Sequence, residues 1–346
     1  MFAQEHNREV VKICLRRRMR STAATWLGLA SLLALSGCAS VQVHLGMKVY
    51  LAKIPATAIT VTAPKGPAIG PGEKLPLVVT VTESDGKTLQ TEGAGQGKVM
   101  WKDLTATATV ATVNQKGIVS LSRDPRISDG KVPHVTVTVP SHPELRAELD
   151  IPVRYNEKYT ANFSGSNGSS GMNGSDGMNG SSGSSGSTDP NNPSPGGNGG
   201  NGSNGSDGGD GGNGGDAPPV QVRMAFRSGS RPLLQVSVSA AGHQKFYLVD
   251  PQGGSLTVRA DGGQGGSGGR RGRGGQGGSG GIGSPSGSSG TSGFDGRNGS
   301  DGQPGRGGSI TVTYDPQAKP FLTALHLSNI GGPKPVFQEE AVAPLW

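Results

Sequence analysis

The sequence is poor in the residues that usually hold a folded chain together. It contains 2 cysteines among 346 residues, so a disulfide framework cannot be its main support. Aromatic residues make up only 4% of the chain, whereas glycine alone occupies 61 positions. With so few large side chains and so much glycine, the whole chain cannot form one packed globule.

Long apolar runs are also missing, apart from one near the N-terminus. That run extends from about Ala23 to Leu35, and its 13 residues (35 − 23 + 1) are too few for a hydrocarbon core that needs about 20. Arginines precede the run and small residues follow it. This order of basic, apolar and small residues is typical of a secretory signal. We therefore assign residues 1–37 to a signal peptide, with Met1 or Met19 as its start.

The end of this segment, Leu35-Ser36-Gly37-Cys38, resembles the lipobox of bacterial lipoproteins. The resemblance implies that Cys38 becomes the lipid-modified first residue of the mature chain, with palmitate among the attached acyl groups. Ala39 follows it, rather than the aspartate that lipoprotein sorting associates with inner-membrane retention. We expect a chain anchored by lipid in the bacterial outer membrane, facing either the periplasm or the cell surface. Cys14 would leave with the signal, so no disulfide would remain.

Positive charge is concentrated in the signal. The formal net charge of the chain is +7. Residues 1–37 hold six basic and two acidic side chains, a net of +4, which leaves +3 for the remainder (7 − 4). So small an excess is not the signature of a nucleic-acid-binding protein, and no nucleic acid is expected as a partner.

Residues 57–155 read as short β-strands separated by turn residues. Val135, Val137 and Val139 alternate with polar residues, which is the period-two pattern of a half-buried strand. Many such strands in about 100 residues predict an antiparallel sandwich. The expected strands are TAITVTA from Thr57, KLPLVVTVT from Lys74, KVMWK from Lys98, TATVATV from Thr107, GIVSL from Gly117, VPHVTVTV from Val132 and LRAELDIPV from Leu145.

Part of this region resembles the bacterial Ig-like domains of the Big type. The likeness rests on Trp101, on Ala111-Thr112-Val113, and on Asn114 and Gly117 before Val119. It implies an Ig-like sandwich, a fold that by itself names no function. We expect Trp101 to be a core residue; the alternative is a platform on which a carbohydrate stacks.

Two tracts then repeat glycine at every third residue. The first runs from Gly165 to Gly215 and changes phase around STDPNNPSP, while the second keeps one phase from Gly263 to Gly308, broken by Ser284. Three residues per turn and a rise of about 3.1 Å per residue define polyproline II. Both interruptions contain proline and lie near the middle of their tract, where a turn would lie. The pattern therefore predicts four polyproline II rods.

Three interpretations of the tracts are open: a collagen-like homotrimer, a disordered linker, and an intrachain bundle of rods. A collagen triple helix needs more proline, and a Gly/Ser-rich linker buries too little apolar surface to fold. We favour the bundle because the similar phrases GSLTVRAD and GSITVTYD frame the second tract, as matching exit and entry strands would. We expect these strands to lie in one sheet. GQPGRGGSITVTYDPQ, from Gly302, also weakly resembles the glycine-rich domain of Obg-type GTPases, which implies a fold type only.

The predicted fold class is all-β, with an Ig-like antiparallel sandwich followed by a β module that carries two glycine-rich polyproline II excursions, and with no sizeable helix outside the signal. The expected divisions are the signal 1–37, an anchor linker 38–56, the sandwich 57–155, the first tract 156–219, strands 220–261, the second tract 262–308, and closing strands and a tail 309–346.

No constellation of catalytic or cofactor-binding residues is apparent. The histidines after the signal are scattered, and no serine stands in a nucleophile-elbow pattern, so we expect neither an enzyme nor a cofactor or metal. The weak candidate for calcium is a stripe with a spacing of three, which lacks the known calcium-loop patterns. Its residues are Asp207, Asp210, Asn213 and Asp216.

The expected function is therefore a lipid-anchored structural or adhesive protein of the cell envelope. The alternatives are a surface glycan-binding module, which exposure of Trp101 or Tyr247 would favour, and a collagen-like homotrimer. The segment RRGRGG from Arg270 resembles an RNA-binding segment, but an exported chain makes an anionic envelope polymer or another surface protein the more reasonable partner.

Overall fold

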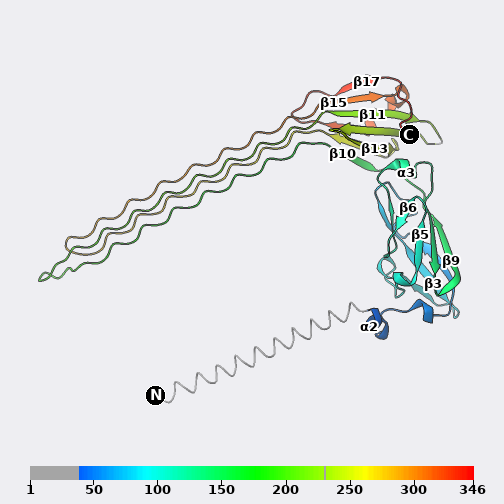
Figure 1. The fold of residues 1–346 in the computed structure, drawn as a ribbon, viewed down its shortest axis with the longest axis horizontal. Coiled ribbons are helices and arrows are strands. Elements are labelled where there is room, and N and C mark those ends of the chain that lie inside the picture. The colour runs from blue at the N-terminus through cyan, green and yellow to red at the C-terminus, as the bar shows by residue number, and fades with distance from the viewer. Residues whose placement is uncertain (1–38, 230) are drawn as a thin grey trace, which may run out of the picture. The chain divides into compact units, whose positions relative to one another are not determined.

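The computed structural model describes residues 39–229 and 231–346 and divides the chain into two compact units (Figure 1). The first unit ends at Arg154 and the second spans Tyr155–Trp346. The predicted signal and Cys38 lie outside the described residues. Within the described residues, no helix has the length and apolar character needed to cross a membrane.

The first unit is built from short strands, after a short helix α2 (Ala39–His44) and a 3₁₀ turn η1 (Leu51–Lys53). Its sheets have the orders β1-β3-β4, β2-β7-β6 and β5-β8-β9, and every strand pair in them is antiparallel. The elements are β1 (Ala56–Thr62), β2 (Lys74–Pro76), β3 (Val78–Glu83), β4 (Thr88–Gln90), η2 (Gly93–Gly95), η3 (Trp101–Asp103), β5 (Thr105–Ala108), β6 (Ala111–Val113), β7 (Ile118–Leu121), α3 (Pro125–Ser128), β8 (His134–Val139) and β9 (His142–Asp150).

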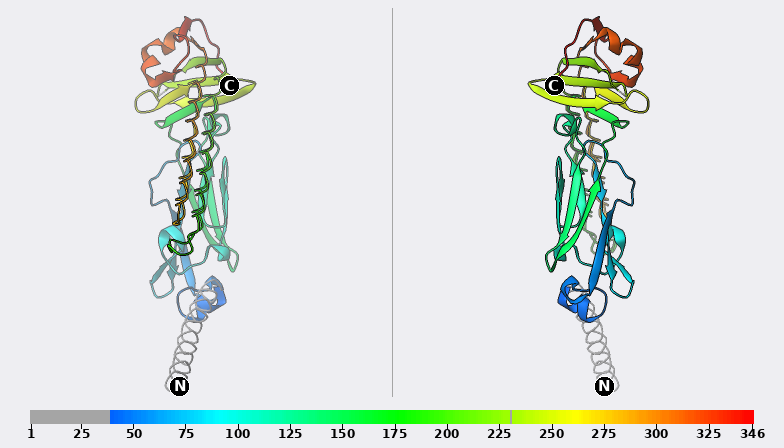
Figure 2. Two further views of the ribbon diagram at one scale, coloured as in Figure 1. Left: turned by 90° about the vertical axis from the view of Figure 1, so that its left-hand side faces the viewer. Right: turned by 90° about the vertical axis from the view of Figure 1, so that its right-hand side faces the viewer.

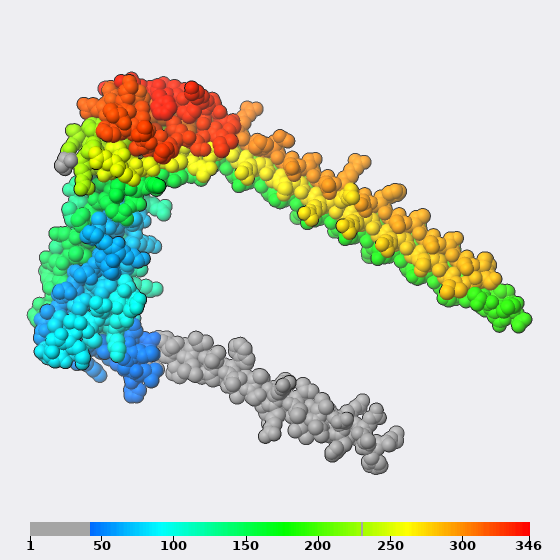
Figure 3. All heavy atoms as spheres, turned by 180° about the vertical axis from the view of Figure 1, so that it is seen from behind, coloured from blue at the N-terminus to red at the C-terminus, as the bar shows by residue number. Residues whose placement is uncertain are grey.

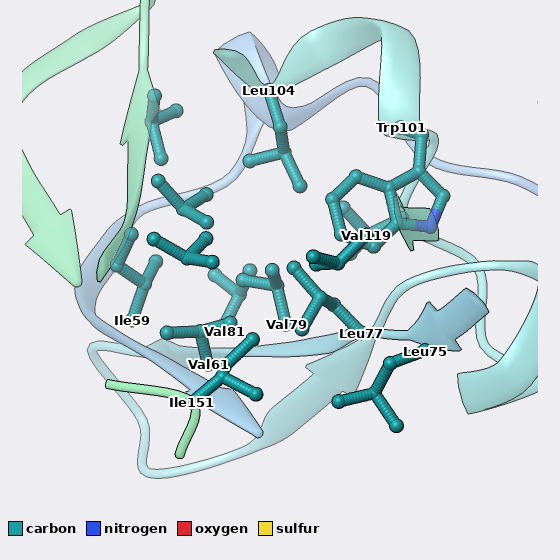
Figure 4. Close-up of a cluster of buried hydrophobic side chains, with 14 of the residues drawn as sticks. Ile59, Val61, Leu75, Leu77, Val79, Val81, Trp101, Leu104, Val119 and Ile151 are labelled. Carbon is teal, nitrogen blue, oxygen red and sulfur yellow. The ribbon is translucent and has the colours of Figure 1, made fainter. Parts of the chain in front are cut away.

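Trp101 belongs to a cluster of buried, mostly aliphatic side chains from these sheets (Figure 4). Trp101 is 5% exposed, which confirms it as a core residue and removes it as a stacking platform. Its ring fits because Gly117 lies against it: a Cβ on Gly117 would meet the ring at 2.0 Å. Gly117 also has φ +69°, a left-handed conformation that glycine adopts without a steric penalty.

Three expected strands differ from the observed ones. KVMWK is not a strand: Val99 forms isolated bridges to Val49 and Thr91, and the chain then turns into η3. KLPLVVTVT divides at Leu77, because β2 pairs with β7 whereas β3 pairs with β1 and β4. TATVATV divides into β5 and β6 at Val110, whose φ of +65° breaks the extended backbone.

The second unit contains two sheets that share one core. Strands β10, β14 and β16 form a parallel sheet, and the second sheet has the order β13-β12-β11-β15-β17. The elements are β10 (Lys158–Asn162), β11 (Val220–Arg227), β12 (Leu233–Ala240), β13 (His243–Val249), β14 (Ser255–Arg259), β15 (Ile310–Tyr314), the 3₁₀ helix η4 (Pro316–Ala324), β16 (Leu325–Ser328) and β17 (Val336–Glu339). The all-β fold class is confirmed.

The similar phrases that frame the second tract do not lie in one sheet, so that prediction was wrong. GSLTVRAD forms β14 in the three-stranded sheet, and GSITVTYD forms β15 in the five-stranded sheet. The true partners are the strands that frame the first tract: β10 pairs with β14, and β11 pairs with β15, both in parallel. Each sheet therefore contains one strand that adjoins the first tract and one strand that adjoins the second.

Candidate functional site: the polyproline II bundle

The two glycine tracts form one bundle of four extended rods within the second unit. Figures 1 and 2 show the rods running together away from the sheets. Rod 1 is 165–186, rod 2 is 196–216, rod 3 is 262–283 and rod 4 is 287–306, with turns between rods 1 and 2 and between rods 3 and 4. At about 3.1 Å per residue, a rod of some 20 residues is roughly 60 Å long.

Backbone hydrogen bonds join the rods at every third residue. Rods 1 and 3 run in parallel, as do rods 2 and 4, whereas rods 1 and 2, 2 and 3, and 3 and 4 are antiparallel. The N···O distances in these ladders are 2.6–3.0 Å. Rods 2 and 3 thus bond to all three other rods. Polyproline II has no hydrogen bonds of its own, so these ladders supply the pairing that buried backbone groups require.

The parallel ladders continue the register of the sheets. Asn162 pairs with Arg259 in the β10–β14 ladder, a separation of 97 residues (259 − 162), and Asn167 of rod 1 bonds to Gln264 of rod 3 at the same separation of 97. The β11–β15 ladder and rods 2 and 4 share a separation of 90 (310 − 220). The strands therefore fix which residues of the rods lie side by side.

The glycines at every third position form the interior walls. In the rows that contain Gly165, Gly196, Gly262, Gly263 and Gly287, an added Cβ would lie 1.9–2.4 Å from a carbonyl oxygen of a neighbouring rod or of Pro195 beside rod 2, apart from Gly283, where it would meet the nitrogen of Gly196 at 2.2 Å. Real Cβ atoms do not come so close. Rods at this spacing therefore admit only glycine, which explains the period that the sequence shows.

Asparagine and aspartate make a second contact that sequence reasoning missed. Asn198 accepts the N–H of Ser288 through Oδ1 at 2.9 Å, and the next residue, Gly199, donates its own N–H to the carbonyl of Ser288. One Asn or Asp and the residue after it, which is glycine except for Ala217 after Asp216, thus hold one residue of the parallel rod at two points; we call this arrangement an Asx clasp. The clasps are centred on Asn167, Asn173, Asp176 and Asn179 in rod 1, and on Asn198, Asn201, Asn204, Asp207, Asp210, Asn213 and Asp216 in rod 2.

The calcium candidates all belong to these clasps. Asp207, Asp210, Asn213 and Asp216 each accept a backbone N–H from rod 4 at 2.6–2.8 Å. Part of their lone-pair capacity is therefore already used. In the part of the chain that the structure describes, no group of three or more His, Cys, Asp or Glu side chains is placed to hold a metal ion.

Charge attraction contributes little to joining the two tracts. The carboxylates of the first tract bind backbone N–H groups, including that of Arg297, which donates to Asp207. The ion pair found within the rods joins Arg271 to Asp295 at 3.1 Å, and both residues belong to the second tract. The tracts are joined by backbone and Asx hydrogen bonds rather than by opposite charges.

The outward positions of the rods carry large side chains. Figure 3 shows those of the second tract standing out along the bundle. Met172, Met178 and Phe294 are 78–81% exposed, and Ile282 is 68% exposed. The arginines of the second tract are also exposed. Tyr247, by contrast, is half-buried and packs on Tyr159 with ring centroids 5.8 Å apart, so it forms no open stacking platform.

A buried aspartate holds the junction where β14 becomes rod 3. Asp261 is 6% exposed and accepts hydrogen bonds from the Ser328 hydroxyl at 2.5 Å, the Ile330 N–H at 2.9 Å and the Arg259 guanidinium at 3.0 Å. Burial raises the pKa of the Asp261 carboxyl, but these hydrogen bonds and the charge of Arg259 outweigh it and lower the pKa. The Asp261 carbonyl also accepts the first N–H of rod 1, from Gly165.

The scattered histidines do not form a site. His134 lies on β8 with its Nδ1 2.8 Å from Asp150 Oδ1, and His142 lies on β9 with its Nε2 3.2 Å from the Leu51 carbonyl oxygen.

No known family model and no curated protein matches the chain.

Gly211 and Gly212 provide a test of the interior walls. A Cβ on Gly211 would meet the Gly266 carbonyl oxygen at 2.1 Å, so Gly211→Ser should lower the free energy of unfolding by about 3 kcal/mol or more. Gly212 lies in the same row as Ser203 and Ser206, whose hydroxyls bind rod 1, so Gly212→Ser should change it by less than about 1 kcal/mol. Denaturant unfolding of both variants would measure this, and equal losses would contradict the packing.

The Asx clasps should also protect the chain chemically. Asn-Gly sequences deamidate when the glycine nitrogen attacks the asparagine Cγ, expels ammonia and closes a succinimide, which water then opens to aspartate or isoaspartate. In the clasps that nitrogen already donates to a neighbouring rod. We expect deamidation in the folded chain to be at least tenfold slower than in Gly272→Val. The added side chain of that variant would collide with the Ser175 carbonyl at 1.9 Å and open the bundle. A tenfold difference in rate corresponds to about 1.4 kcal/mol in the activation free energy.

Mass spectrometry of aged samples would follow the conversion of amide to acid in both proteins, and circular dichroism would confirm that Gly272→Val has opened the bundle. Gly212→Ser is the matched control, since it should keep the slow rate of the parent. Equal rates in the parent and the opened variant would contradict protection by the clasps.

Asp261 predicts a pH dependence. Because its pKa is lowered in the folded protein, its stabilising contribution is present above the ordinary carboxyl pKa of about 3.9 and is lost as pH falls through the folded value. Asp261→Asn should cost about 2 kcal/mol at neutral pH, and the difference from the parent should shrink below about pH 4. Denaturant unfolding across pH tests this. Asp301→Asn, which keeps an oxygen for the Gly268 N–H, should cost little.

Proposed function

We propose that this chain is a non-enzymatic, lipid-anchored protein of the bacterial cell envelope that presents the bundle as a structural or adhesive surface. The observation that carries the proposal is that the rods use different residues for their interior and for their outer surface. Glycines and backbone make the interior, while methionine, phenylalanine and arginine occupy outward positions. A scaffold of this kind keeps its shape whatever its exposed side chains are.

Rigidity supports a role in presentation. A Gly/Ser-rich segment without partners would be a flexible coil, whereas here the rods are joined along their whole length by ladders that continue from two sheets. The surface side chains are thus held at fixed spacings, which reduces the conformational entropy lost when a partner binds.

The lipid anchor is the other half of the proposal, and it rests on the Leu35-Ser36-Gly37-Cys38 box. Metabolic labelling with a palmitate analogue in the bacterial host should mark the protein. Cys38→Ala should abolish the label, and the matched variant Cys14→Ala should keep it, because Cys14 lies within the predicted signal. Fractionation of the envelope should place the labelled protein in the outer membrane.

Label that survives Cys38→Ala, or that disappears with Cys14→Ala, would contradict the anchor. Recovery of the labelled protein with the inner membrane would contradict the proposed location while leaving the lipid in place.

A further inference from the structure

Two rows of positions on rod 3 bear on its basic residues. One row begins at Gln264, and its N–H groups donate to Asx side chains of rod 1, namely Asn167, Asn173, Asp176 and Asn179. The other begins at Gly265 and faces rod 4. This second row is glycine at 265, 268, 274, 277, 280 and 283, and arginine at 271.

The arginine in that row is an exception to the packing of the bundle. At the flanking positions Gly268 and Gly274, an added Cβ would lie 2.1 Å from a carbonyl oxygen of rod 4. Arg271 carries a Cβ in this row, while its N–H donates to Asn298 Oδ1 of rod 4 at 2.9 Å and the Gly296 N–H donates to the Gly272 carbonyl at 2.9 Å. Departures from a local structural rule tend to occur at functional sites.

Arg271 belongs to a cluster of three arginines. Arg270 and Arg273 lie in the neighbouring row, one triplet apart, which places their Cα atoms about 9 Å from each other along the rod. All three side chains are exposed. Arg271 pairs with Asp295 at 3.1 Å, whereas Arg270 and Arg273 form no ion pair with any residue that the structure describes.

The carboxylates beside the cluster are already engaged. Asp176 of rod 1 accepts the backbone N–H of Arg273 at 2.7 Å. Asp295 of rod 4 accepts the N–H of Gly274 at 2.9 Å through its other oxygen. The guanidinium groups of Arg270 and Arg273 are therefore available to an external anion, and they project from a backbone that is fixed by its ladders.

We propose that Arg270, Arg271 and Arg273 bind a phosphate-bearing glycan of the cell envelope. The guanidinium fork matches phosphate oxygens in a bidentate geometry. A row on the outside of a rod touches its ligand on one side, so its affinity depends on engaging several charges at once. A polymer or a glycolipid surface with repeated phosphates meets that need. The inference rests on the proposed envelope function and names a partner for it.

A nucleic acid also has repeated phosphates, but the site lacks a feature that single-stranded nucleic acids use. Such proteins stack bases on aromatic side chains beside the basic groups. Rod 3 contains no aromatic residue, and Phe294 lies on rod 4 in the row that bonds to rod 2. The cluster is thus suited to charge recognition without base stacking.

The test is binding of the full chain to phospholipid vesicles that contain lipopolysaccharide with its phosphates, beside vesicles whose lipopolysaccharide has been enzymatically dephosphorylated. Arg270→Gln/Arg273→Gln should weaken binding about tenfold or more. The matched control is Arg297→Gln/Arg306→Gln, which removes the same charge from rod 4 of the same bundle and should weaken binding less than about twofold. Circular dichroism should show both variants folded.

Preferential binding to the phosphorylated vesicles, lost with the rod 3 pair, supports the proposal. Equal weakening by the two pairs would show attraction to net charge alone and overturn the site. Tighter binding of a single-stranded oligonucleotide than of the vesicles would overturn the partner. Failure to bind phosphorylated vesicles would overturn this inference and leave the lipid-anchor experiment unaffected, so the two proposals fail separately.

Discussion

The second unit depends on one constraint: buried backbone N–H and C=O groups must find partners. A polyproline II rod provides none for itself, so it persists in a folded protein when other rods lie close enough to accept and donate. That distance is short enough to exclude a Cβ, as the 1.9–2.4 Å clearances at carbonyl oxygens show. Glycine at every third residue, the antiparallel returns and the pairing of the two tracts all follow from this requirement.

The same glycines increase the conformational entropy that the chain loses when the bundle forms, because glycine has more backbone freedom in the unfolded chain than any other residue. The sheets help to offset that loss because their paired strands hold the rods in register where each rod meets its sheet. Rods 1 and 3 leave β10 and β14 in the register of the sheet, and rods 2 and 4 enter β11 and β15 in theirs. Asp261 lies between β14 and rod 3, and its carboxylate accepts hydrogen bonds from Ser328 of β16 and from Ile330 just beyond that strand.

Much of the architecture could be predicted from local sequence. Period three marked the rods, proline marked their turns, and alternating valines marked strands such as β8. The failures concern pairing. The likeness of GSLTVRAD and GSITVTYD suggested one sheet, but similar strands need not be neighbours, and the shared separations of 97 and 90 residues emerge only when partner rods are known. The Asx clasps were missed for the same reason, although Asn or Asp before glycine recurs throughout the first tract.

The arginine cluster differs in kind from these features. Periodic glycines and Asx clasps are explained by the bundle's own stability, because removing them leaves a collision or an unpaired N–H. Among the described residues Arg270 and Arg273 have no ion-pair partner, and Arg271 stands in a row of rod 3 that is otherwise glycine. A stability requirement would not select the side chains of Arg270 and Arg273. In a scaffold whose interior tolerates so little variation, outward side chains that make no ion pair within the bundle are the ones on which a partner can act, and Arg270 and Arg273 lie where the arginines of rod 3 are gathered.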